Sequence, residues 1–198
     1  MGAVELMGVA ASLSLLAGWR LYACVAGVGI AMRIGLLDLP DKIQALDVLA
    51  NPWVIGVASL GAVAELFADK VMWLDTLWDG VHTLIRPLGG ALLALAVVDA
   101  SDPTWQVLVF LLGGGAALLS HGAKAGARAA VNASPEPVSN MVVSTAEDVA
   151  SFGGLWLVLT QPGAAVGVAV VMVVVAVGLL ILSWRMLAAL RRWFAPRA

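Results

Sequence analysis

Two acidic side chains near the end of an apolar segment are the first sign of chemistry in this 198-residue chain. Glu65 and Asp69 are four residues apart, so on a helix they share one face. Two like charges on one face repel each other unless a cation, a proton or a basic side chain lies between them. Arg20 is a candidate partner from the middle of an apolar stretch, where an arginine costs about 2.5–3.5 kcal/mol to insert even on the lenient scale. The sequence therefore predicts that these charges meet inside the protein.

A second polar group follows a long apolar segment. His121, Lys124 and Arg128 are spaced at i, i+3 and i+7, which places them on one face of a helix. They could hold a small anion, or they could neutralise Glu147 and Asp148 further along the chain. Both interpretations stay open, because spacing within one helix does not say which partner is near.

The segment that follows predicts a helix break. Pro135 and Pro137 are incompatible with an unbroken helix around them. Ser144 and Glu147 then have the spacing of a capping box, in which the serine caps a helix and the glutamate reaches back. A helix that begins there would point free N–H groups at an anion held by the basic group. The alternative is one continuous helix over Val138–Leu159.

Charged and polar groups at membrane depth form the candidate site for a small ion or an anionic solute, because their insertion cost marks them as functional. They are Arg20, Glu65, Asp69, His121, Lys124, Arg128, Asn132, Ser144, Glu147 and Asp148. The two histidines have no metal-ligand spacing around them, and no nucleophile–base pair is recognisable in the sequence. We therefore expect no enzyme, no metal and no cofactor.

The composition places these residues in a membrane. Hydrophobic residues make up 62% of the chain and charged residues 12%, against about 45–50% and about 25% in a soluble domain. The net charge of −2 gives no reason to expect a nucleic-acid partner. We expect an all-α, polytopic transmembrane helical bundle that contacts membrane lipid.

About six spans are expected in a single transmembrane domain that covers residues 1–198. The apolar segments are Val4–Met32, Pro52–Ala68, Pro87–Val98, Thr104–Ser120, Ser139–Thr160 and Gly163–Leu182. Val71–Arg86 repeats its apolar residues at helical spacing, which predicts an amphipathic helix lying in the membrane interface and ending at Pro87.

The basic residues predict the orientation. With six crossings, Lys70, Arg86, Lys124, Arg128 and the basic tail 185–198 all fall on one side, whereas the opposite loops hold Lys42 as their one basic residue. The positive-inside rule then places both termini in the cytoplasm, at the inner membrane of a cell.

A weak internal similarity suggests 3+3 inverted repeats with an interrupted helix. Leu15–Arg20 and Leu118–Lys124 each lead from small residues to a basic residue. They begin on the first and fourth predicted spans, which run in opposite directions, and inverted repeats of this kind are a common transporter plan.

Several short motifs across the chain carry a family resemblance. They are Ala64–Leu66 with Ala68–Lys70, Ile85–Ala91, Lys124–Gly126 with Arg128, Val131–Pro135 through Ser139–Asn140, and Glu147–Asp148. In these motifs the chain resembles a family of bacterial integral membrane proteins known only as a domain of unknown function. The resemblance implies a small polytopic inner-membrane protein and implies no activity.

The leading hypothesis is a small transporter or channel-like protein with a charged site that faces the cytoplasm and moves a small ion or anionic solute. One alternative is a structural or accessory membrane subunit, in a larger complex or a homo-oligomer, whose ion pairs only organise the helices. The other is a protein that binds a lipid phosphate through its basic group.

Overall fold

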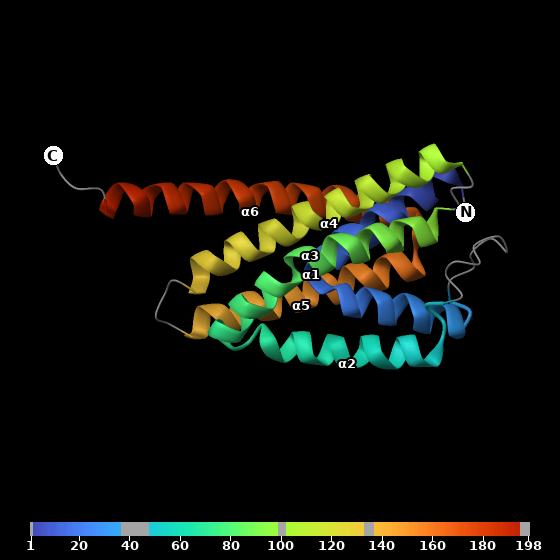
Figure 1. Ribbon diagram of the computed structural model, residues 1–198, viewed down its shortest axis with the longest axis horizontal. Coiled ribbons are helices and arrows are strands. Elements are labelled where there is room, and N and C mark those ends of the chain that lie inside the picture. Colours follow the sequence, from blue (N-terminus) through green and yellow to red (C-terminus); the bar gives the residue numbers. More distant parts are fainter. Residues whose placement is uncertain (1, 37–47, 99–101, 133–136, 195–198) are drawn as a thin grey trace.

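The computed structural model describes residues 2–36, 48–98, 102–132 and 137–194. Within these ranges the chain is helical and has no strand. The elements are α1 (Ala3–Arg33), α2 (Pro52–Ala68), α3 (Met72–Val97), α4 (Pro103–Asn132), α5 (Pro137–Thr160), the short 3₁₀ helix η2 (Pro162–Ala164) and α6 (Ala165–Phe194). Figure 1 shows them as one elongated bundle.

The helices have the length and composition of membrane spans. Among the described residues, α1, α3, α4, α5 and the η2–α6 segment are long and apolar enough to cross a bilayer, and α2, with 17 residues, is slightly shorter. A crossing needs about 20 apolar residues. The prediction of an all-α transmembrane bundle is confirmed.

Helix α1 is broken at its centre and folds back. Arg20 has non-helical backbone angles (φ −142°, ψ 70°). Before the break, the Ser12 hydroxyl donates to the Ala165 carbonyl at the start of α6 (2.6 Å). After the break, Gly27 packs against Leu155 near the end of α5. Both halves of α1 therefore reach the same end of the bundle and form a helical hairpin (Figure 1), whose break is at Arg20.

This hairpin changes the expected topology. The sequence predicted a single crossing over Val4–Met32, but the second half of α1 returns to the end from which the first half came. The later helices α2 to α6 then run alternately along the bundle, and the two ends of the chain lie at opposite ends of the long axis (Figure 1). Which side of a membrane each terminus faces stays a prediction.

Helix α3 corrects the prediction of an interfacial helix. It runs from Met72 to Val97 without ending at Pro87, so the predicted surface helix and the short third span are one element. Its polar face is buried and comprises Asp75, Asp79, His82 and Arg86. Its apolar face is exposed and includes Trp73, Leu77, Val81 and Leu84. The helical periodicity of this segment is as predicted, but the polar face is the buried one, because the medium around a membrane helix is apolar.

Helix α5 settles the alternative that the sequence left open. It is continuous from Pro137 to Thr160, and Ser144 is a buried residue inside it. The interrupted version with a capping box is wrong, and the interrupted helix is α1 instead. Pro137 stands at the first position of α5, where a missing N–H costs nothing; Pro135 lies outside the described residues.

The half of the bundle near the N-terminus has an apolar core. It is formed mainly by α1 together with the second half of α3, the end of α5 and the start of α6: Val9, Leu13, Leu16, Val28, Leu93, Val97, Leu155, Val158 and Met172. Small residues let α3 and α4 approach closely: a methyl group added to Gly113 would lie 2.6 Å from the Ala94 side chain. Close contact between small residues is the usual way in which membrane helices pack.

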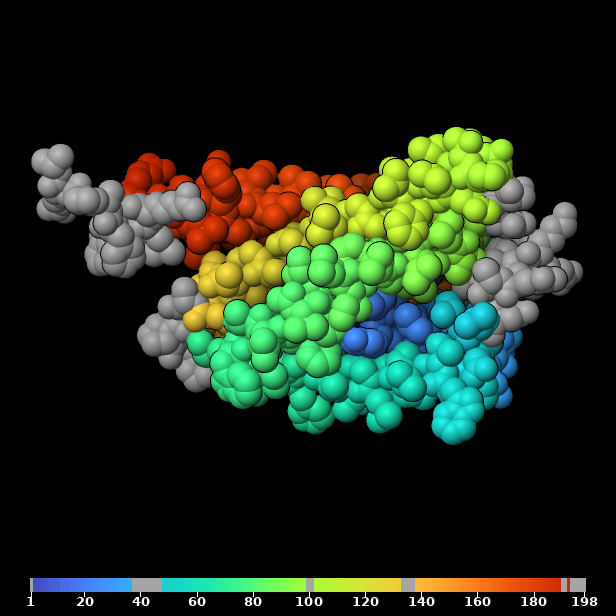
Figure 2. Space-filling view, viewed as in Figure 1, coloured from blue at the N-terminus to red at the C-terminus, as the bar shows by residue number. Residues whose placement is uncertain are grey.

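Helix α2 lies at the edge of the bundle and leaves a hollow beside α3. The hollow has a volume of about 730 Å³ and is lined by apolar residues of α1, α2 and α3, with Tyr22 and Val25 from the hairpin among them. In Figure 2 the residues of α1 are visible at its floor, between α2 and α3.

Candidate functional site: a buried charge network

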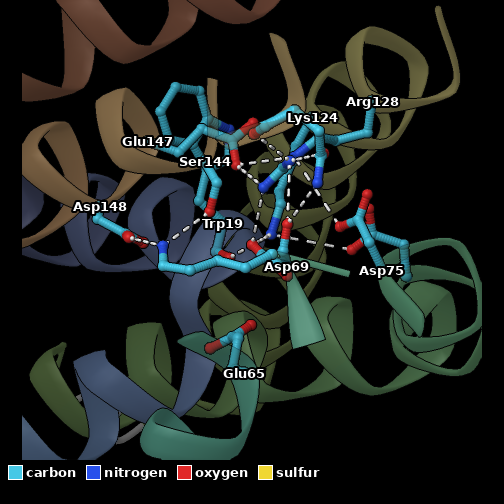
Figure 3. A network of polar contacts seen from close by, with 12 residues as sticks. Trp19, Glu65, Asp69, Asp75, Lys124, Arg128, Ser144, Glu147 and Asp148 are labelled. Atoms are coloured by element: carbon cyan, nitrogen blue, oxygen red, sulfur yellow. Dashed lines mark hydrogen bonds and ion pairs between the residues drawn. The ribbon is translucent and has the colours of Figure 1, made fainter. Parts of the chain in front are cut away.

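Four cationic side chains are buried in the other half of the bundle, around the break in α1. Figure 3 labels two of them, Lys124 and Arg128, close to Asp69 and Glu147. Arg20 comes from α1, Arg86 from α3, and Lys124 and Arg128 from α4. Each exposes at most 1% of its surface. A buried cation is strongly unfavourable unless it is paired and hydrogen-bonded. The position of these four residues therefore depends on the acidic groups around them.

Asp69 is the acceptor on which three of these cations converge. It follows α2 directly, so the end of that helix fixes its backbone. Its Oδ2 atom lies 2.7 Å from Arg20 Nη1, 2.6 Å from Lys124 Nζ and 3.3 Å from Arg128 Nη2. Its main-chain carbonyl also accepts from the Asn140 amide (3.2 Å). One residue thus joins α1, α4 and α5.

Arg86 is the centre of a second group. Its Nη2 donates to Glu65 Oε1 (2.6 Å), and its Nη1 lies 3.0 Å from Asp79 Oδ1. The same Nη1 contacts His121 Nδ1 (2.7 Å) and the Gly18 carbonyl (3.3 Å). Glu65 and Asp69, which share a helix face, therefore receive their positive charges from different residues.

The contact with Arg86 determines the tautomer of His121. A guanidinium only donates hydrogen bonds, so His121 Nδ1 is the acceptor and the ring proton is on Nε2. Nε2 then donates to Thr83 Oγ1 (3.1 Å), whose own hydroxyl donates to the Asp79 carbonyl (2.9 Å). His121 is consequently a neutral link between α4 and α3.

The second histidine lies beside this network. His82 Nδ1 donates to the Trp78 carbonyl (2.7 Å), and its Nε2 contacts the Tyr22 hydroxyl (3.0 Å). The His82 and Trp78 rings are stacked with centroids 4.4 Å apart. Tyr22 in turn lines the apolar hollow beside α2.

The end of α4 and the middle of α5 are joined by Arg128. Its Nε and Nη2 atoms lie 3.1 and 2.9 Å from Glu147 Oε2, and its Nη1 donates to Asn140 Oδ1 (2.6 Å). Arg20 also pairs with Asp148, and so does Lys70, through Nζ at 3.0 Å. Of the basic group, Arg128 therefore neutralises Glu147, whereas Asp148 is neutralised by Arg20 and Lys70. The interpretation that the basic group pairs with the acidic residues of α5 holds for Glu147 alone.

The network does not have the anion-binding geometry that the sequence predicts. Ser144 is not at a helix N-terminus: it lies within α5, and its Oγ accepts from Lys70 Nζ (3.2 Å). His121 is engaged by Arg86, and Lys124 and Arg128 already pair with carboxylates. The geometry on which the lipid-phosphate alternative depended is absent from the described part of the chain.

Among the residues that the structure describes, the buried charges do not balance. Five carboxylates are buried: Glu65, Asp69, Asp75, Asp79 and Glu147. Four cations are buried: Arg20, Arg86, Lys124 and Arg128. The more exposed Lys70 and Asp148 pair with each other and add no net charge. Within the described ranges no group of three or more acidic, histidine or cysteine residues has the arrangement of a metal site.

All ten residues named from the sequence take part in this network, although their role in binding an ion or a solute stays a prediction. Sequence reasoning missed Asp75, Asp79 and Arg86, because Val71–Arg86 was placed at the surface. Asp75 accepts from the Asn132 amide (2.8 Å). The signal was present: a polar stripe on a helix next to apolar spans points inward when lipid surrounds the protein.

The comparisons with known proteins agree with the sequence resemblance. No curated protein and no solved structure matches the chain. One family model, described as a domain of unknown function (DUF4126), matches residues 7–182. That range includes nearly all of the bundle and every residue of the buried charge network. The chain is therefore a member of the DUF4126 family.

Proposed function

We propose that this protein is a small membrane transporter or channel-like protein, and that the buried charge network is its site for a proton or another small cation. The observation that carries the proposal is the excess of one buried carboxylate over the buried cations in the described residues. Burying an uncompensated charge is costly, so a site with a net negative charge favours a positive occupant. This count disfavours the anionic solute of the sequence-based hypothesis.

The break in α1 supports the same proposal. The first half of the hairpin ends at Arg20, so its last carbonyls have no partner further along the helix. The Gly18 carbonyl accepts from Arg86 Nη1 (3.3 Å), and the Trp19 carbonyl accepts from Lys124 Nζ (3.4 Å). The negative end of a helix dipole thus faces the cations of the network. Transporters commonly bind ions at interrupted helices of this kind.

The charges at the two ends of the bundle support an orientation. The C-terminal end carries Lys70 and Arg185, and the tail adds Arg191, Arg192 and Arg197. Of the described residues at the opposite end, Glu5 and Asp102 are acidic and Arg33 is basic. The sequence between α1 and α2 and between α3 and α4 that lies outside the described ranges contains Asp38, Asp41, Asp47 and Asp99 against Lys42. By the positive-inside rule we infer a cytoplasmic C-terminus in an inner membrane, with the N-terminus opposite and the network in the cytoplasmic half.

The test is ion flux in proteoliposomes that contain the purified protein. Glu65→Gln and Lys124→Ala should each abolish the flux of protons or monovalent cations, because each changes the charge inside the network. Asp102→Asn is the control, since Asp102 is exposed at the other end of the bundle and asparagine caps a helix equally well. Unchanged flux in both network variants would remove these residues from the mechanism.

The structural alternative has its own support. The four buried cations all lie within 3.0 Å of at least one carboxylate oxygen, as expected of groups that only join helices. The same experiment separates the two functions. A folded wild-type protein that conducts nothing under proton, sodium or potassium gradients would favour the structural role.

A further inference from the structure

Asp75 differs from the other acidic residues of the network. The other five carboxylates, Glu65, Asp69, Asp79, Glu147 and Asp148, each have a cationic nitrogen within 3.0 Å. The cationic nitrogen recorded near Asp75 is Arg128 Nε at 3.9 Å, which is too far for a hydrogen bond. Asp75 is nevertheless completely buried. The excess negative charge of the network is therefore centred on this residue.

The surroundings of Asp75 stabilise a negative charge only weakly, through one neutral amide and an arginine beyond hydrogen-bond distance. Asp79 on the same helix and Asp69 after α2 are its acidic neighbours. From α4 it meets Arg128, which already binds Glu147, and the neutral amide of Asn132. A buried carboxylate without a hydrogen-bonded cation, next to like charges, takes up a proton.

The hydrogen bonds of Asn132 point to the same conclusion. Its Nδ2 donates to Asp75 Oδ2 (2.8 Å), while Asp75 Oδ1 and Asn132 Oδ1 are both buried without a hydrogen-bond partner in the described residues. A carboxylic acid and an amide can form two hydrogen bonds side by side, from the amide N–H to the acid carbonyl and from the acid O–H to the amide oxygen. A proton on Asp75 Oδ1 supplies the missing donor between these two groups.

We propose that Asp75 and Asn132 form a proton-binding site, in which a neutral Asp75 carboxylic acid is paired with the Asn132 amide. The site lies in the first turn of α3 and at the last residue of α4, so it is at the end of the bundle that also carries Lys70. Asn132 is partly exposed, whereas Asp75 is buried. The use of this proton in transport rests on the proposed function, whereas its presence does not.

Infrared spectroscopy tests the protonation directly. At neutral pH the purified wild-type protein should show a carboxylic-acid C=O band that shifts in heavy water. Asp75→Asn should abolish the band. Glu147→Gln is the matched control and should keep it, because Glu147 is paired with Arg128. If the wild type has no band, the inference is wrong. If Asp75→Asn keeps the band, the proton is on another carboxyl group of the network and the inference is wrong as well.

Stability provides a second measurement. An asparagine amide can replace the acid in both hydrogen bonds with Asn132, so Asp75→Asn should unfold at the same temperature as the wild type. A loss of stability equal to that of Asp69→Asn would show an ionised Asp75 and overturn the proposal. The flux measurement distinguishes this inference from the proposed function. If the wild-type protein conducts ions but has no carboxylic-acid band, only the proton site is wrong. If it has the band but conducts no ions, only the transport role is wrong.

Discussion

The two halves of this bundle are built on opposite principles. The half around Leu13, Leu93 and Leu155 consists of side chains that lipid would accept equally well, so their burial gives no hydrophobic gain and close packing holds the helices. The half around Asp69 and Arg86 consists of groups that lipid excludes, so each residue stays buried only because its partners are present. We therefore expect substitutions in the apolar half to lower the stability by amounts that depend on the local packing. A substitution in the charged half should also destabilise the buried partners of the changed residue.

The strongest test of this comparison removes the residue on which three cations converge. Asp69→Asn keeps the size of the side chain but leaves Arg20, Lys124 and Arg128 without their shared carboxylate. Breaking a buried ion pair from one side costs about 3–5 kcal/mol. We expect a large fall in the thermal unfolding temperature in detergent, while Asp75→Asn, made beside it, stays at the wild-type value. Equal stability of Asp69→Asn and the wild type would contradict the interdependence of the charged half.

A smaller effect is expected from crowding the apolar half. In Gly113→Ala the new methyl group would lie 2.6 Å from the Ala94 side chain, so α3 and α4 must separate. Overpacking of this kind costs about 1–3 kcal/mol. Gly115→Ala is the matched control two residues away, since nothing lies within 4 Å of the added carbon. Thermal unfolding of the two variants side by side measures the difference, and equal temperatures would show that α3 and α4 are not closely packed.

The smallest effect should come from the rim of the network. Lys70 is 38% exposed and pairs with Asp148 at 3.0 Å. Exposed ion pairs contribute about 0–1 kcal/mol and are screened by salt. Lys70→Ala should therefore lower the unfolding temperature only slightly, and less still at high salt. A loss as large as that of Asp69→Asn would extend the interdependent region to the surface of the bundle.

The comparison also explains which residues could be found from the sequence. Arg20, Glu65, Asp69, Lys124 and Arg128 are conspicuous because each stands next to a long apolar run, where its cost is evident. Asp75, Asp79 and Arg86 lie on an amphipathic segment that reads equally well as a surface helix. Periodicity gives the two faces of a helix but not what surrounds each face.

Local sequence alone determined the class of the protein. Its apolar content requires a membrane, its helix lengths follow from the bilayer, and the cost of intramembrane charges requires that acids and bases meet. Only the tertiary structure decided that α1 turns back at Arg20, that α3 continues through Pro87 and that α5 continues past Ser144. The reason is physical: a break or a buried face is decided by which partners arrive from other helices, and neither propensity nor spacing within one segment contains that information.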